Sequence, residues 1–180
     1  MALAGAFTGS VAADGDPTAG DETFSEQLFT VLGATHEYRS VHTAKEAGYE
    51  ELEAVAALGH VFEYSAYWDG NEYTGPTELS EPPALLFYAP ISGEGDSDDR
   101  DLVLAGVEYT VSGDRTGNPP DLFADEDSSR ELKVTDEEGW HRSPDPAAHD
   151  VTGLHVWLYL SNPEGLFRLG HPYMEQLVET

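Results

Sequence analysis

The sequence predicts an α+β fold in which two N-terminal helices pack on a mainly antiparallel β-sheet that forms a sandwich or a small barrel. Helical patterning is confined to residues 23–47, and from Gly59 onward aromatic and β-branched runs alternate with clusters of Gly, Pro and Asp. Between the expected strands, no segment has a helical pattern long enough for the crossover helix that parallel strands need. Antiparallel pairing of neighbouring strands is therefore expected.

The two expected helices begin after a polar linker. Thr23 and Glu26 have the spacing of a capping box, in which each side chain bonds the other residue's backbone N–H, and Gly33 is expected to end this first helix. The second helix is expected over residues 35–47, with Gly48 as its C-terminal stop. Both helices show apolar residues at helical spacing, which predicts one buried face for each.

The remaining chain forms the sheet of a single domain. Residues 1–20 are interpreted as a leader remnant and linker, and residues 21–180 as one globular domain, the usual number for this length. The chain has no cysteine, which excludes disulfides, thiolate metal sites and cysteine nucleophiles. Five segments have the composition of strands: 60–68, 84–88, 102–111, 132–135 and 154–160.

The charge pattern indicates the environment of the protein. Asp and Glu number 35 against 8 Lys and Arg, and lysine occurs only at Lys45 and Lys133. Such a surface repels itself in dilute buffer, whereas at ~1 M salt the Debye length is only about 3 Å and the repulsion is screened. The composition favours a halophilic protein, the alternative being an ordinary acidic surface that avoids anionic partners. Nucleic acid is not an expected partner in either case.

The first thirteen residues, MALAGAFTGSVAA, are uncharged and small or apolar. They resemble the later part of a secretory signal peptide with its small-x-small cleavage site, so an extracellular protein is expected, and a basic segment, for example a twin-arginine one, would lie upstream. The alternative is a cytosolic N-terminal extension. Neither this run nor residues 151–163 has the length to span a bilayer, so no membrane span is expected.

Three expected strands each carry one polar, metal-competent residue within an apolar run: His60, Glu108 and His155. Strand alternation predicts that Glu108 shares a face with Leu102 and Leu104, where an ionised carboxylate needs a partner or a cation. Two imidazoles and a carboxylate are a common ligand set for zinc or non-haem iron. The alternative is that the histidines are ordinary hydrogen-bonded residues and that Glu108 faces solvent.

Two loop histidines, His141 and His171, are further candidate ligands. The sequence has no G-x-S-x-G, no H-E-x-x-H and no phosphate-binding loop, so it does not indicate a reaction. A metal-free binding or interaction module with an unknown small molecule or extracellular partner is the alternative function. In that case aromatic residues would line its binding face: Trp68, Tyr73, Trp140, Trp157 and Tyr159.

Several segments also carry a family resemblance, in the order AKEAGY, PALLFYAP, LVLAGVEYTV, PDLF, EEGW and LHVWLYLSNPEGLF. Across roughly residues 38–172 the chain resembles a family of small, uncharacterised exported proteins of prokaryotes and looks like a haloarchaeal-type member. The resemblance implies one fold and export, and it places Glu108 and His155 in family motifs. It departs from the family at 170–172, and His60 corresponds less closely. It implies no activity.

Overall fold

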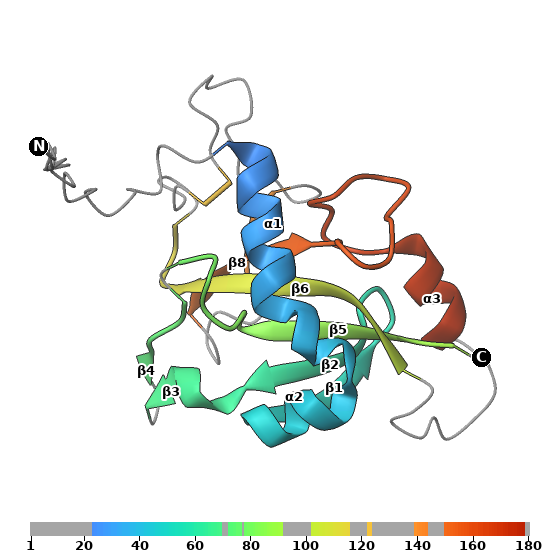
Figure 1. The fold of residues 1–180 in the computed structure, drawn as a ribbon, viewed down its shortest axis with the longest axis horizontal. Helices are drawn as coiled ribbons and strands as arrows, with labels where there is room; N and C mark the ends of the chain where they lie inside the picture. The colour runs from blue at the N-terminus through green and yellow to red at the C-terminus, as the bar shows by residue number, and fades with distance from the viewer. Residues whose placement is uncertain are drawn as a thin grey trace, which may run out of the picture.

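The computed structural model describes residues 23–69, 72–76, 78–91, 102–115, 122–123, 139–143 and 150–178. It confirms an α+β fold built on a six-stranded antiparallel sheet with the order β1-β2-β5-β6-β8-β7 (Figure 1). The strands of this sheet are β1 Tyr49–Val55, β2 Gly59–Tyr64, β5 Leu85–Pro90, β6 Leu102–Ser112, β7 Trp140–Arg142 and β8 Val151–Val156. A separate ribbon pairs β3, Trp68–Asp69, with β4, Glu72–Tyr73. The strand expected at 132–135 lies outside the described residues.

The N-terminal helices begin where the sequence predicts. Helix α1, Phe24–Thr35, starts at the expected capping box, in which Thr23 and Glu26 bond each other's backbone N–H. Gly33 does not end this helix, which continues to Thr35. The second helical segment is divided into a 3-10 turn, η1 His36–Arg39, and helix α2, Val41–Ala47. Extended backbone at Ser40 makes the division, and Gly48 ends α2 at φ 105°.

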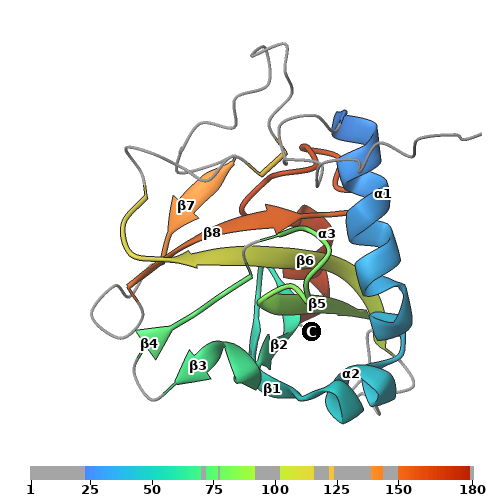
Figure 2. The same ribbon diagram turned by 60° about the vertical axis from the view of Figure 1, so that its left-hand side comes forward.

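Both faces of the sheet are covered by other parts of the chain. On one side α1 and α2 pack over the sheet, and their residues Val31, Val41 and Ala44 join the large core cluster that includes Val107 and Tyr109 of β6. On the other side lies the C-terminal segment with helix α3, Pro172–Val178, which Figure 2 shows across the sheet from α1. A smaller cluster fills that side: Val61, Phe87, Ala89, Ala105, Trp157 and Met174.

A β-bulge in β6 decides which side Glu108 occupies. Phe87 of β5 pairs with Gly106 and Tyr88 pairs with Leu104, which leaves Ala105 as an extra residue. Leu102 and Leu104 therefore lie on the helix side, whereas Ala105 belongs to the opposite cluster. The expectation that Glu108 shares a face with Leu102 and Leu104 is wrong, because the bulge shifts the alternation by one residue. Glu108 points to the side of α3.

Candidate metal site

The site is built on three neighbouring strands of the sheet. Glu108 on β6 lies directly opposite His155 on β8. The edge strand β7 pairs His141 with Gly153, two residues before His155 on the same strand face. Strand pairing alone therefore places Glu108, His155 and His141 side by side on the α3 side of the sheet.

The side chains converge as closely as this backbone arrangement allows. Nε2 of His155 lies 2.9 Å from Oε2 of Glu108, and the ring centroids of His141 and His155 are 4.4 Å apart. One ligand atom from each of the three residues lies within 4.8 Å of the others. Glu108 is 7% exposed and His155 2%, while His141 is half-buried. A buried Glu/His/His group with these separations could hold a metal ion.

The protonation of His155 is fixed by the C-terminal segment. Its Nδ1 is in hydrogen-bond contact with the carbonyl oxygen of Leu169, and because a carbonyl can only accept, Nδ1 carries a proton and donates it. Nε2 is then the nitrogen that faces Glu108. Metal-binding histidines typically bind the ion through one ring nitrogen and donate a hydrogen bond from the other to a carbonyl or carboxylate. The ring of Phe87 packs against His155 at 4.8 Å between centroids.

The carboxylate of Glu108 is held from two directions. His155 contacts Oε2, and the hydroxyl of Thr110 donates to Oε1 at 2.8 Å. The carboxylate lies directly over Gly153, where an added Cβ would come within 2.0 Å of Oε1. Glycine at this position is thus what leaves room for the carboxylate beside β8.

The electrostatics of the cluster favour a charged Glu108. Burial alone would raise the pKa of this carboxyl group, but the charge of His155, with hydrogen bonds from His155 and Thr110, lowers the pKa below its ordinary value. The carboxylate therefore stays ionised although it is buried. Among the carboxylates whose burial the structure describes, Glu108 alone is buried.

His141 differs from its two neighbours because its Nδ1 has no hydrogen-bond partner among the described residues, although a backbone hydrogen bond with Gly139 acts on the ring. Burial, and next the charge of His155, lower the pKa of His141 to about 4, although Glu108 acts in the opposite direction. The ring is consequently neutral at pH 7, which is the form that binds metals. Its Nδ1 is buried and has no hydrogen-bond partner within the described part of the chain, a rare condition for a buried nitrogen.

The structure brings together two of the three expected ligands and leaves the third apart. His60 lies on β2 opposite Tyr88, while the row that leads to Glu108 runs through Glu63 and Leu85. His60 is therefore three residues further along the sheet and two strands away. Its Nδ1 lies 3.2 Å from Oε1 of Glu51. The third member of the group that could hold a metal is His141 instead.

Of the remaining predicted residues, four are buried and two, Trp68 and Tyr159, are partly buried. His171 is buried beside Trp157 and its Nε2 lies 3.3 Å from the carbonyl oxygen of Ser161, outside the Glu/His/His group. Trp140, Trp157 and Tyr73 are likewise buried in the core. These aromatic side chains do not present the exposed binding surface that the alternative function requires.

Comparison with models of protein families, with characterised proteins and with solved structures finds no match to this chain. Within the described residues, no helix is both long and apolar enough to cross a membrane.

Proposed function

We propose that the protein binds one divalent metal ion, zinc or iron, through Glu108, His141 and His155. The observation that carries the proposal is the approach of three ligand atoms, from three strands, to within 4.8 Å of one another. Two imidazoles and one carboxylate form a ligand set used for zinc and for non-haem iron, with further positions left to water or substrate. A metal-dependent activity is compatible with this set, and its substrate class is left open.

The competing interpretation is a buried ion pair without metal. Protonated His155 and ionised Glu108 would satisfy each other, and both have further hydrogen bonds from the surrounding chain. That interpretation leaves His141 unexplained, because a neutral imidazole with an unpartnered buried Nδ1 adds no bond to the pair. A cation bound by all three residues would give the His141 imidazole a partner and offset the desolvation of Glu108.

A bound divalent metal with an open position would supply a Lewis acid and could lower the pKa of a water molecule toward neutrality. The residues of the chain would define the environment of that position. Phe87 and Trp157 flank His155 with aromatic rings, and Thr110 holds Glu108 in place. Glu108 and His155 are thus oriented before any metal arrives, which reduces the reorganisation on binding.

Metal binding by purified protein tests the proposal directly. Untagged protein, stripped with a chelator and titrated with Co²⁺ in concentrated KCl, should take up about one equivalent and develop visible absorption. His141→Ala and His155→Ala should each weaken binding by at least about tenfold, because each removes a ligand. Less than about a tenth of an equivalent in the wild-type protein would contradict a tight site.

His60→Ala is the matched control. His60 is also a strand histidine beside a carboxylate, Glu51, but it lies outside the three-residue group. It should bind Co²⁺ as the wild type does. Equal loss of binding in His60→Ala and His141→Ala would show that histidine content, rather than this geometry, determines uptake.

We also infer that the protein is exported into salt-rich surroundings. The support is compositional: a net charge of -27, two lysines in 180 residues and the uncharged run at 1–13. The described acidic side chains agree with this, since Glu37, Glu46 and Glu50 are exposed.

A further inference from the structure

We propose that Arg142 is a positioning residue that fixes the edge strand β7 and thereby holds His141 in the metal site. This inference rests on the proposed function, because it concerns how the third ligand of that site is presented. Arg142 is the residue after His141, and it has no atom in the Glu/His/His group itself.

The need for such a residue follows from the position of β7. The strand has three residues and, among the described residues, pairs with β8 alone. A strand this short, at the edge of a sheet, has few backbone hydrogen bonds to hold it. His141 is its central residue, so any displacement of β7 moves this ligand relative to Glu108 and His155.

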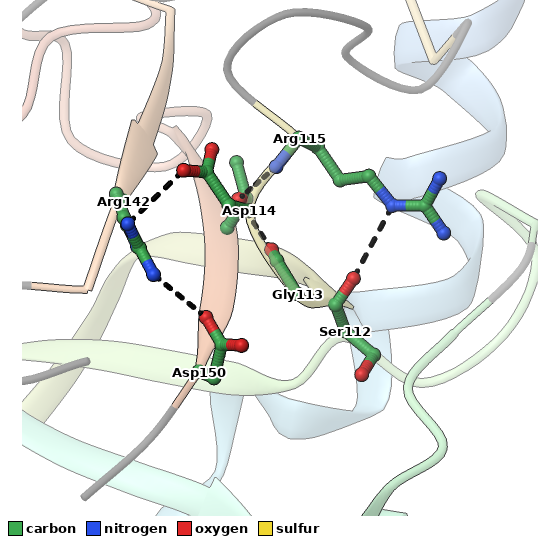
Figure 3. A network of polar contacts seen from close by, with 7 residues as sticks. Ser112, Gly113, Asp114, Arg115, Arg142 and Asp150 are labelled. Carbon is green, nitrogen blue, oxygen red and sulfur yellow. Dashed lines mark hydrogen bonds and ion pairs between the residues drawn. The ribbon is translucent and has the colours of Figure 1, made fainter. Parts of the chain in front are cut away.

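The Arg142 guanidinium group joins the ends of two other strands. Its Nη1 lies 3.0 Å from Oδ2 of Asp114, and its Nη2 lies 3.0 Å from Oδ1 of Asp150. Asp114 follows β6 and Asp150 precedes β8, the two strands that carry Glu108 and His155. Figure 3 shows the Arg142 side chain reaching between the two carboxylates. One side chain thus ties the ligand strand β7 to both of the other ligand strands.

The backbone that carries Asp114 is itself held by a hydrogen-bond network. The Thr152 hydroxyl donates to the carbonyl oxygen of Gly113 at 2.8 Å and accepts from the backbone N–H of Arg115 at 3.0 Å. The backbone on both sides of Asp114 is therefore anchored to β8. Thr152 is also the residue of β8 that pairs with Arg142. Asp114 therefore lies on backbone that is bonded to β8 where Arg142 pairs with it, rather than in a free loop.

Backbone hydrogen bonds hold both ends of β7, and Arg142 adds side-chain contacts to them. At the start of the strand, the Gly139 N–H donates to the Phe167 carbonyl oxygen at 2.9 Å and Trp140 is fully buried. At the far end, the Ser143 N–H donates to the carbonyl oxygen of Val151 at 3.0 Å. Arg142 supplies the side-chain contacts at that end, and His141 lies between the two anchored ends.

The sign of the effect separates positioning from long-range electrostatics. Removing a positive charge near a cation site favours the bound cation. Loss of Arg142 should weaken metal binding instead, because it releases His141, so the two effects have opposite directions. Exposed ion pairs contribute modestly, and for Arg142→Gln we expect about a threefold to tenfold weaker affinity for Co²⁺.

A thermodynamic cycle measured with Co²⁺ tests the proposal. Arg142→Gln should weaken binding, Arg142→Lys should recover part of the loss because it keeps one charged contact, and His141→Ala should weaken it most. If Arg142 acts through His141, the double variant should bind as His141→Ala does. Wild-type affinity in Arg142→Gln, or a further loss in the double variant equal to that of Arg142→Gln alone, would overturn the proposal. Arg39→Gln removes an exposed positive charge on η1 and should have no effect on the affinity.

Hydrogen exchange of the metal-free protein keeps this test separate from that of the proposed function. In Arg142→Gln the backbone amides of β7 should exchange several-fold faster while those of α1 stay unchanged. Unchanged exchange in β7 would refute the positioning role, whether or not metal binds. Failure of the wild type to bind Co²⁺, with faster exchange of β7 in the variant, would refute the metal site alone.

Discussion

Gly153 determines how closely Glu108 can approach β8. The backbone at this position is ordinary extended strand, so the requirement for glycine comes from the space that the carboxylate occupies rather than from φ. A Cβ at 153 would lie 2.0 Å from Oε1 and 2.8 Å from the carboxyl carbon of Glu108. The Glu108 carboxylate thus occupies the space beside β8 that the methyl group of an alanine at 153 would fill.

Gly153→Ala should therefore remove the site. The added methyl group would displace the Glu108 carboxylate from His155 and Thr110, which leaves buried polar groups unpaired, and we expect destabilisation by about 1–3 kcal/mol. Co²⁺ binding should be lost at the same time. Urea unfolding and Co²⁺ titration measure the two effects.

Gly33→Ala serves as the control for a glycine substitution. Gly33 lies inside α1 with nothing within 4 Å of an added Cβ, so alanine should stabilise the helix by up to about 1 kcal/mol. Wild-type stability in Gly153→Ala would mean that Glu108 is not held where the structure places it.

The stability of the metal-free protein should fall on acidification. Because the pKa of His141 is lowered from 6.5 to about 4 in the folded state, the unfolded chain binds more protons between these values and the free energy of unfolding decreases as pH falls through them. Glu108, whose pKa is also lowered, adds a further decrease below its ordinary value of 4.5. Urea unfolding between pH 8 and 4 at constant salt measures the slope.

His141→Gln should flatten that slope between pH 6.5 and 4, because it removes the buried imidazole. An equal slope in the variant and the wild type would place the responsible group elsewhere.

At this scale the sequence identified two of the three candidate ligands. Glu108 and His155 stood out because each is a polar residue within a long apolar strand pattern. His60 satisfies the same criterion and yet lies elsewhere, because one strand pattern does not specify the order of strands in the sheet. The sequence places His141 only in a loop, since the three residues of β7 are too few to show alternation.

At the scale of elements, the expected helices and four of the expected strand regions are present, while short or charged elements went unpredicted. Strand β1 contains Glu50, Glu51 and Glu53, and this charge is more typical of a loop than of a strand. The segment nevertheless pairs with β2 at both of its ends. Helix α3 has seven residues and begins at Pro172, the last residue of a Gly-His-Pro sequence. Charge and brevity weaken the periodic pattern on which sequence prediction depends. The bulge at Ala105 could not be foreseen either, because it depends on the partner strand β5.

The segment between β8 and α3 forms an element without regular structure that covers the site. Three consecutive carbonyl oxygens, of Arg168, Leu169 and Gly170, accept hydrogen bonds from side chains. The donors are, in the same order, Trp157, His155 and Asn162. This pairing explains how residues 168–170 hold a fixed path against β8, and it makes the orientation of His155 depend on that path.

At the scale of the whole molecule, charge is the dominant property. The net charge of -27 is distributed over a domain in which the described carboxylates are largely exposed. Repulsion among them opposes the folded state and is reduced as salt shortens the screening length to about 3 Å at ~1 M.

We therefore expect secondary structure to be lost on dialysis into low salt. Circular dichroism at decreasing KCl concentrations measures this loss, and exchange of KCl for an equal concentration of sucrose tests whether ions, rather than solute in general, are required. A spectrum that stays constant from high to low salt would contradict halophilic adaptation. For an exported protein, the chain should also be found in the culture medium of its host rather than in the cell extract alone.

The placement of the three ligands on separate strands has a consequence for biogenesis. Glu108 and His155 are 47 positions apart in the chain and meet only when β6 and β8 have paired. A nascent or unfolded chain therefore offers no such site, and an ion bound at the proposed site would be acquired after the sheet has formed. If the chain is exported in the folded state, it would bind the metal inside the cell. If it is exported unfolded, it would bind an ion from the salt-rich medium outside.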